Sequence, residues 1–184
     1  MTRLIAGVAG GRRLKVPATG VRPTGDRARE GLFNSLGTLV DLEGATVLDL
    51  YAGSGALGLE ALSRGAASAV FVESSPRVLP VLRGNLAAVG LPGGRIVAGS
   101  VPTVVAGQAP SAFDLVLADP PYDVLVDEVL GVLRGLVDGR WLASGAVLVV
   151  ERSSREEPFA WPTPLTGLRD RRYGEALLRY GRSP

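Results

Sequence analysis

The chain has 184 residues, a formal net charge of +2 and a hydrophobic fraction of 46%, a composition that suits one compact globular domain. It contains no cysteine and no histidine, which excludes disulfides, metal sites built from these residues, and catalytic triads with a histidine base. Any chemistry is therefore left to carboxylates, backbone groups and a bound cofactor.

No apolar run approaches the roughly 20 residues that a membrane-spanning helix needs, and the glycine-broken N-terminal stretch is too short for a signal peptide. The only lysine, Lys15, does not lie in a phosphate-binding P-loop pattern. We therefore expect a cytoplasmic protein made of a single domain, 1–184, in which residues 1–40 form an extension and residues 41–184 form the core.

The extension is predicted to contain a β-hairpin and a helix. Two short runs, LIAGV at 4–8 and RRLKV at 12–16, flank a glycine-containing turn and predict the hairpin. Residues 26–40 predict a helix. Its apolar face is formed by Ala28, Leu32, Leu36 and Leu39. Gly31 lies inside this helix at a cost of about 1 kcal/mol relative to alanine, so it marks either a close contact or a tolerated residue.

From residue 46 onward the sequence alternates between strands and helices. Apolar runs predict strands at 46–51, 68–73, 95–98, 113–118 and 146–151. The segments between them predict helices near 56–64, 76–89, 101–107 and 124–137. This alternation indicates a parallel sheet covered by helices on both faces. Two last strands, 167–173 and 175–180, are predicted to form a hairpin about Gly174.

Charge is distributed unevenly along the chain. Residues 1–40 hold seven Arg or Lys against two acidic residues, 41–150 hold six against eleven, and 151–184 hold seven against five. A basic extension on an acidic core indicates that the ends of the chain contact nucleic-acid phosphate. Solvated surface charges, or pairs such as Asp26 with Arg29, explain the same pattern. The candidate residues for this phosphate contact, which the resemblance described below assigns to RNA, are Arg12, Arg13, Lys15, Arg22, Arg27 and Arg29.

A glycine-rich turn follows the strand at 46–51. Residues 53–58 read G-S-G-A-L-G, a G-x-G-x-x-G pattern between a strand and a helix, where glycines permit a tight turn and close approach of a ligand. Dinucleotide-binding folds share this pattern, so it is weak alone. Asp49 lies four residues before Gly53, where a carboxylate can face a cationic ligand. Glu73 ends the neighbouring strand, within reach of a ribose diol.

These residues predict a cofactor crevice. S-adenosylmethionine carries an ammonium and a sulfonium group, and carboxylates suit it better than they suit a pyrophosphate. The candidate cofactor-binding residues in this part of the chain are Asp49, Tyr51, Ala52, Gly53, Ser54, Gly55 and Glu73.

The motif Asp119-Pro120-Pro121-Tyr122 follows the apolar run at 113–118. The two prolines fix their φ angles and lack an N–H, so the loop is stiff and its carbonyls stay free. The Asp119 carboxylate and a proline carbonyl can accept the hydrogens of a planar exocyclic amine, and the Tyr122 ring can stack on the base. As a turn alone the tetrapeptide would be unremarkable. The upstream glycine turn favours the functional interpretation.

On these motifs the chain resembles the class I S-adenosylmethionine-dependent methyltransferases, and more narrowly the RsmD family of bacterial 16S ribosomal RNA guanine-N2 methyltransferases. The N-terminal R-P-T-x-D-R-x-R-E-x-x-F-N pattern separates this family from other DPPY enzymes. The resemblance covers nearly the whole chain, in the segments IAGVAGGRRLKVP (5–17), RPTGDRAREGLFNSL (22–36), LDLYAGSGALGLEALSRGA (48–66), VFVE (70–73), DLVLADPPY (114–122) and RRYGEALLRY (171–180).

The resemblance implies an α/β, Rossmann-like fold: a mostly parallel seven-stranded sheet with a C-terminal antiparallel hairpin, preceded by the short hairpin and helix. It implies that Asp49, Gly53 and Glu73 bind the cofactor S-adenosylmethionine, and that residues 119–122 hold the target amine, with Asp119 also next to the cofactor. The implied partner is 16S rRNA, within a 30S subunit or an assembly intermediate. We expect a monomer that needs neither a metal nor a membrane.

One position departs from the wider class. After the strand at 95–99, many such enzymes place an acidic or amide side chain to hold the adenine amino group, whereas this chain has Ser100. Adenine recognition would then use the Ser100 hydroxyl or backbone groups.

Three alternatives remain open on the sequence. The chain could be a DPPY methyltransferase that acts on the N6 amine of adenine in DNA, because the motif reads an amine rather than a base. It could be a nicotinamide-dependent oxidoreductase that uses the same glycine turn. It could also be a non-catalytic RNA-binding module that keeps the fold.

Overall fold

The computed structural model describes residues 1–17 and 25–184, so the predicted phosphate contact at Arg22 lies outside the described residues. Strands β1 (Thr2–Arg3) and β2 (Arg13–Leu14) pair antiparallel, which confirms the N-terminal hairpin. The first strand lies before the predicted range 4–8, and the second is shorter than the predicted 12–16. The ladder does not continue past Leu4, because the backbone N–H groups of Ile5 and Ala6 donate to the buried Glu60 carboxylate.

Helix α1 (Asp26–Leu36) follows and ends before residue 40, although Leu39 still packs against the core. Gly31 marks a close contact, since a Cβ there would lie 2.3 Å from the Tyr173 ring. The Arg169 Nη2 donates to the Ser35 carbonyl at 3.0 Å, and the Arg182 Nη2 donates to the Leu39 carbonyl at 2.8 Å. The extension is therefore fixed against the C-terminal hairpin.

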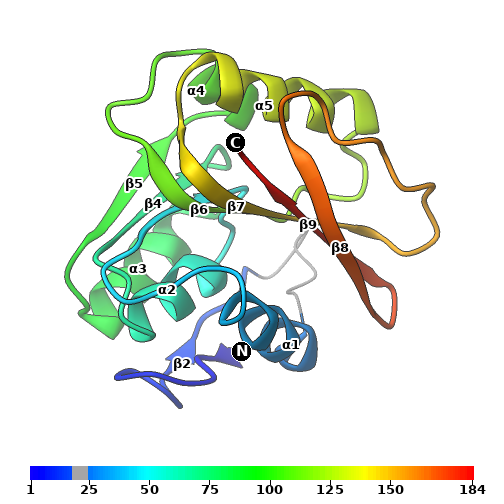
Figure 1. Ribbon diagram of the computed structural model, residues 1–184. Helices are drawn as coiled ribbons and strands as arrows, with labels where there is room; N and C mark the ends of the chain where they lie inside the picture. Colours follow the sequence, from blue (N-terminus) through cyan, green and yellow to red (C-terminus); the bar gives the residue numbers. More distant parts are fainter. Residues whose placement is uncertain (18–24) are drawn as a thin grey trace.

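The sheet has seven strands in the order β5-β4-β3-β6-β7-β9-β8 (Figure 1). Strands β3 to β7 run parallel, and β9 pairs antiparallel with both β7 and β8. This topology confirms the predicted Rossmann-like sheet with its C-terminal hairpin. The strands are β3 (Thr46–Leu50), β4 (Ser68–Glu73), β5 (Gly94–Ala98), β6 (Phe113–Ala118), β7 (Leu142–Ser153), β8 (Thr166–Tyr173) and β9 (Ala176–Arg182).

Helices cover both faces of the sheet, as the alternation of elements predicts (Figure 1). The buried side chains form two clusters, one on each face. Helices α1, α2 (Ala56–Ser63) and α3 (Leu79–Val89) pack on one face, and α4 (Val101–Val105) and α5 (Val126–Asp138) pack on the other. None of the described helices is both long and apolar enough to cross a membrane.

The strand order reverses next to β3, which lies between β4 and β6. In an open parallel sheet, the loops after the strands on either side of such a reversal diverge and leave a crevice at the carboxyl edge. The loops after β3 and β6 are the glycine turn and the DPPY loop. The fold therefore brings together two motifs that lie far apart in the sequence.

Candidate active site

A cleft of about 700 Å³ opens at the carboxyl edge of the sheet, within the size range of small-molecule sites. Its walls come from the glycine turn, the loop after β4, the start of α4, the DPPY loop and the start of α5. The lining residues are Tyr51, Gly53, Val72, Glu73, Ser74, Ser75, Val78, Ser100, Val101, Pro102, Asp119, Pro120, Pro121, Tyr122, Asp123, Val124 and Glu128.

The cleft is acidic. Glu73, Asp119, Asp123 and Glu128 line it, and none of its described lining residues is Lys or Arg. Like charges in a partly enclosed space create a field that attracts cations and repels anions. The cleft therefore suits a cationic ligand and an uncharged amine better than a pyrophosphate or the phosphate of a nucleic acid.

The glycine turn adopts backbone angles that explain its composition. Gly53 has φ 56° and Gly55 has φ 81°, in the left-handed region that glycine enters without a Cβ penalty. Gly58 is needed for space, because a Cβ there would lie 2.4 Å from the Phe71 ring. The turn thus presents backbone atoms, rather than side chains, to the cleft.

Asp49 lies beneath this turn and not on the wall of the cleft. Its side chain is on the α2 side of β3, the residue is 1% exposed, and its Oδ2 accepts from the Gly58 N–H at 2.9 Å. Gly58 is in the first turn of α2, whose N–H groups lack helical partners. In this structure the Asp49 carboxylate fixes the turn and does not line the cleft, so its direct contact with a cofactor stays a prediction.

Burial raises the pKa of Asp49 well above its usual value. The hydrogen bond from Gly58 opposes this rise, and the nearby Asp119 and Glu73 add to it. Three carboxyl groups thus share one end of the sheet. A cation placed among them would relieve both the desolvation and the mutual repulsion.

Glu73, unlike Asp49, lines the cleft. Its Oε2 accepts from the Gly53 N–H at 2.9 Å, and its Oε1 accepts from the Ser75 N–H at 2.7 Å. The side chain therefore joins the glycine turn to the loop after β4. A carboxylate oxygen can accept more than one hydrogen bond, so both oxygens can also accept hydrogen bonds from the hydroxyls of a diol.

Ser100 lies on the opposite wall as the N-cap of α4. Its hydroxyl donates to the Thr103 Oγ1 at 2.7 Å and accepts from the Thr103 N–H at 3.4 Å. This use as a cap favours the second of the two expectations for adenine, namely recognition by backbone groups near Ser100.

The DPPY loop leaves β6 and turns along the cleft. The Asp119 N–H donates to the Leu50 carbonyl at 3.4 Å, which ties the start of the loop to the end of β3. The Pro121 carbonyl accepts from the Val124 N–H at 3.0 Å and closes the turn. The Pro120 carbonyl is therefore the better candidate to accept a substrate amine. Tyr122 is 48% exposed at the cleft, as a stacking ring needs to be.

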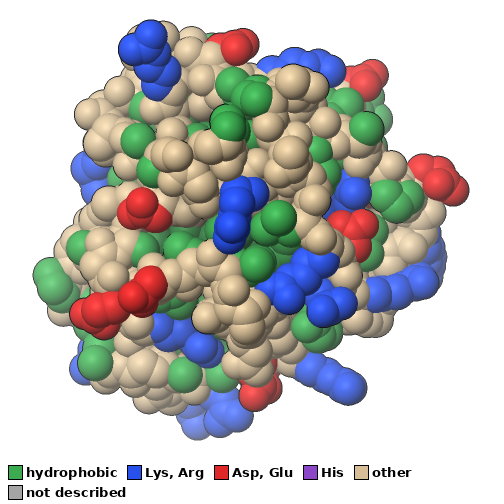
Figure 2. All heavy atoms as spheres, viewed as in Figure 1, with side chains coloured by type: hydrophobic (Ala, Val, Ile, Leu, Met, Phe, Trp, Pro, Cys, Tyr) green, Lys and Arg blue, Asp and Glu red, His purple; other side chains and the backbone are tan. Residues whose placement is uncertain are grey.

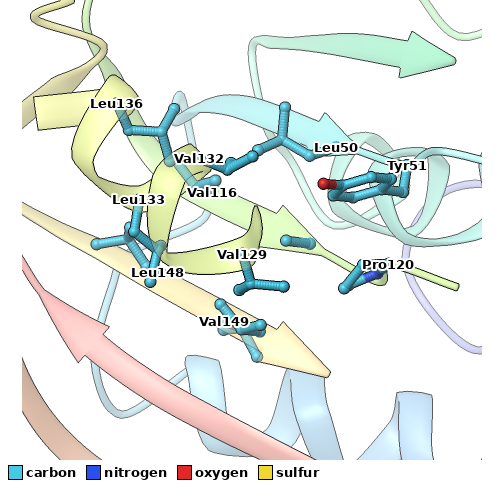
Figure 3. A pocket seen from close by; sticks show the side chains of 12 residues that line it. Leu50, Tyr51, Val116, Pro120, Val129, Val132, Leu133, Leu136, Leu148 and Val149 are labelled. Carbon is cyan, nitrogen blue, oxygen red and sulfur yellow. The ribbon is translucent and has the colours of Figure 1, made fainter. Parts of the chain in front are cut away.

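Tyr51 separates the cleft from a small gap in the core. This gap of about 10 Å³ lies between α5 and the sheet, has apolar walls and holds roughly one water at most, so it is not a ligand site. Figure 3 shows the Tyr51 ring near Pro120, with its hydroxyl directed toward α5. The hydroxyl is buried without a hydrogen-bond partner among the described residues. Burial, supported by Glu128 and opposed by Arg152, raises the pKa of Tyr51 to about 12.

Two buried polar residues that sequence reasoning missed hold the site together. The Arg152 Nη2 donates to the Val124 carbonyl at 2.8 Å and so fixes the end of the DPPY loop. The Asn85 Nδ2 donates to the Ser54 carbonyl at 2.8 Å in the glycine turn. Asn85 could have been found, because it is the one polar residue at a core-facing position of an otherwise apolar helix pattern. Arg152 had no comparable signal.

The candidate RNA-facing residues divide into two groups. Arg12, Arg13, Lys15 and Arg27 are exposed. Arg29 is fully buried, and its Nη2 donates to the Arg3 carbonyl and to the Asp26 Oδ1. A guanidinium with no exposed surface cannot reach a phosphate, so the predicted RNA contact is wrong for Arg29, which anchors the hairpin to α1 instead.

We expect Glu73→Ala to weaken S-adenosylmethionine binding about tenfold to hundredfold, because hydrogen bonds to charged groups contribute about 1.5–3 kcal/mol each. Isothermal titration calorimetry measures this change, and circular dichroism checks that the fold is kept. Glu157→Ala is the matched control, since Glu157 is exposed and does not line the cleft. Wild-type affinity in the Glu73 variant would show that this carboxylate does not contact the cofactor.

Comparison with known proteins gives consistent matches over the whole chain. The family model described as Conserved hypothetical protein 95 matches residues 2–182. The chain is 43% identical, over 81% of its length and 73% of the relative's, to the ribosomal RNA small subunit methyltransferase D of Escherichia coli K12. It is 34% identical, over 96% and 91%, to the protein of the same name in Haemophilus influenzae. The solved structure of yhhF from Escherichia coli superposes with a TM-score of 0.86 at 36% identity, covering 98% and 97% of the two chains.

Proposed function

Because the chain belongs to the family of the ribosomal RNA small subunit methyltransferases D, and so is a methyltransferase, we propose that it methylates the exocyclic N2 amine of a guanine in 16S rRNA. The observation that carries this proposal is the pairing of the glycine turn and the DPPY loop across one acidic cleft. One motif holds a methyl donor there, and the other holds an amine.

S-adenosylmethionine is the proposed methyl donor, and the residues present fit it. Glu73 offers two oxygens for the ribose diol, and the backbone of residues 53–55 allows the close approach that the methionine part requires. The acidic lining suits the positive charges of the ammonium and sulfonium groups. When bound, the cofactor supplies a methyl group on a positively charged sulfur, which is open to attack by a weak nucleophile.

The DPPY loop would orient the amine. The lone pair of a guanine N2 amine is conjugated into the ring, so hydrogen bonds from its two hydrogens to the Asp119 carboxylate and the Pro120 carbonyl are needed to direct the lone pair at the methyl group. Attack on the methyl group would form the N–C bond as the S–C bond breaks, and positive charge would grow on the nitrogen. The fixed Asp119 carboxylate stabilises that charge. The proton then leaves to Asp119 or to water.

Tyr122 would stack on the target base after it has left its helix. Enzymes that act on a base generally turn it out of the stack, at a cost of a few kcal/mol. A base–aromatic stack contributes about 1–3 kcal/mol, so the exposed Tyr122 ring offsets much of that cost.

The acidic cleft also weighs against one alternative. A nicotinamide dinucleotide carries two negative phosphates, which the lining carboxylates of Glu73, Asp119, Asp123 and Glu128 would repel. Methylation of adenine N6 in DNA uses the same amine chemistry and needs an experiment to separate it. We further propose that residues 1–184 act as one methyltransferase domain on 16S rRNA within the small subunit or an assembly intermediate.

The decisive test is nucleoside mass spectrometry of 16S rRNA from cells with and without the gene. We expect N2-methylguanosine to fall by one residue per 16S molecule when the gene is removed, and to return with a plasmid copy. Loss of N6-methyladenine from DNA would favour the alternative, and no change in either nucleic acid would favour a non-catalytic module.

We expect the double reversal Arg12→Glu and Arg13→Glu to weaken RNA binding and to flatten its salt dependence, because fewer counterions are released from phosphates. Filter binding across a salt series measures both quantities. Cofactor binding should stay unchanged, since neither residue lines the cleft. A salt slope equal to that of the wild type would show that both arginines are solvated surface charges that do not contact RNA phosphates.

A further inference from the structure

Two stretches of the sequence, 1–25 and 74–113, contain no acidic residue, although the chain as a whole has 18. Where only these two stretches form the surface, it carries positive side chains and no negative ones. Their basic residues are Arg3, Arg12, Arg13, Lys15, Arg22, Arg77, Arg83 and Arg95.

The two stretches pack against each other. The Lys15 N–H donates to the Asn85 Oδ1 at 2.9 Å, and the Asn85 Nδ2 donates to the Lys15 carbonyl at 2.9 Å. The Arg12 Nη1 donates to the Val89 carbonyl. Asn85 and Val89 both belong to α3, and Asn85 is only 2% exposed. The hairpin is therefore held along the second half of α3, which places Arg12 and Lys15 next to this helix.

Arg3 lies 3.9 Å from Asp26, but the two arginines next to and within α3 are not neutralised by neighbours. Arg77 and Arg83 are exposed and form no ion pair with the described residues. The acidic side chains closest along the fold are already engaged: Glu60 accepts from Ile5, Ala6 and Arg64, and Glu73 accepts from two backbone N–H groups.

This basic face begins at the cleft. Ser75 and Val78 line the cleft, and Arg77 lies in the same short loop. Helix α3 leads away from there for 11 residues, about 16 Å at 1.5 Å per residue. Arg83 lies midway along it, and the hairpin with Arg12 lies beside its end. Positive charge therefore extends from the cleft mouth along α3.

The other candidate surface, around the C-terminal hairpin, differs in its charge. Arg155 pairs with Glu175 at 2.9 Å, and Arg179 pairs with Asp170 at 3.2 Å. Figure 2 shows the face that carries α1, β8 and β9, where basic and acidic side chains are interspersed. Arginines that are already paired release few counterions from a nucleic acid, so Arg155 and Arg179 are weaker candidates for contact with RNA.

We propose that the face formed by α3 and the β1–β2 hairpin carries the phosphate backbone of the RNA substrate, with Arg77 and Arg83 as contacts in addition to the hairpin residues. The inference rests on the proposed function and assigns the path by which RNA reaches the cleft. Phosphates lie on the acid-free face, while the extruded base alone enters the acidic cleft. This separation of charge keeps the phosphates away from the cofactor carboxylates.

The test compares two double variants. Arg77→Gln with Arg83→Gln removes the proposed contacts, and Arg134→Gln with Arg171→Gln removes two exposed arginines from α5 and β8 as the matched control. Binding to deproteinised 16S rRNA is measured over a salt series. Each lost phosphate contact lowers the salt slope by about one, so the first pair should lower it by about two and the control should not change it.

Further measurements separate the possible outcomes. Calorimetry should show unchanged S-adenosylmethionine binding in the α3 variant. A wild type that binds neither free 16S rRNA nor 30S subunits would defeat the proposed function itself. A normal slope for the α3 variant with a reduced slope for the Arg12 and Arg13 reversal would overturn the inference alone. Weaker binding to 30S subunits but normal binding to free rRNA would also overturn it, because the face would then contact protein.

Discussion

Asp119→Ala should lower methylation of 16S rRNA by roughly 10² or more while S-adenosylmethionine still binds. The substitution removes an acceptor for the target amine and a charge that stabilises the transition state, and loss of one preorganised electrostatic partner commonly costs 10²–10³ in rate. The cleft otherwise stays intact, because the glycine turn is held by Asp49, Glu73 and Asn85. Single-turnover assays with radiolabelled cofactor measure the rate of the chemical step.

Tyr122 provides the control that separates stacking from hydroxyl chemistry. Tyr122→Ala should impair methylation through lost stacking, whereas Tyr122→Phe keeps the ring and should be nearly silent. Asp119→Asn keeps one acceptor oxygen without the charge, so its rate should lie between those of the wild type and Asp119→Ala. If the Asp119→Ala enzyme methylates at the wild-type rate, the DPPY loop is a simple turn without a catalytic role.

The architecture could be predicted from the sequence because its signals are local and repeated. Apolar strands such as 113–118 are bounded by turn residues, and buried parallel strands of this kind need helices on both faces. The position of the cleft could also be predicted, since Gly53 and Asp119 lie in the loops that follow β3 and β6, next to the point where the strand order reverses. Helix ends were less certain: α1 ends at Leu36, although its apolar period continues to Leu39.

The orientation of single polar side chains could not be predicted in the same way. Strand periodicity places Asp49 on a face but does not say that the Gly58 N–H will take its carboxylate. Arg29 has the sequence context of a surface arginine, yet the hairpin folds over it and supplies a backbone carbonyl as its partner. Contacts of this kind join residues that are distant in the sequence, such as Arg152 with Val124, and only the assembled fold specifies them.

The state of Asp49 leads to the second large expected effect. Its pKa is raised in the folded protein, so the stability that its protonated form provides is present below the unfolded pKa of about 4 and is lost as pH rises toward the folded value. Asp49→Asn keeps an oxygen for the Gly58 N–H and carries no charge. The difference in free energy of unfolding between Asp49→Asn and the wild type should therefore shift in favour of the variant as pH increases above about 4. Urea titrations at several pH values would measure this difference.

Cofactor binding should respond to Asp49 in the opposite direction. A bound cation favours the ionised carboxyl, so wild-type affinity for S-adenosylmethionine should rise with pH as Asp49 loses its proton. Asp49→Asn should flatten this dependence.

Asp49→Ala, which also frees the Gly58 N–H and loosens the turn, should weaken binding about tenfold to hundredfold. Calorimetry in two buffers of different ionisation enthalpy reports the protons released on binding. If both variants release as many protons as the wild type and bind equally well, Asp49 is only a helix cap, and the charge that attracts the cofactor lies with Glu73 and Asp119.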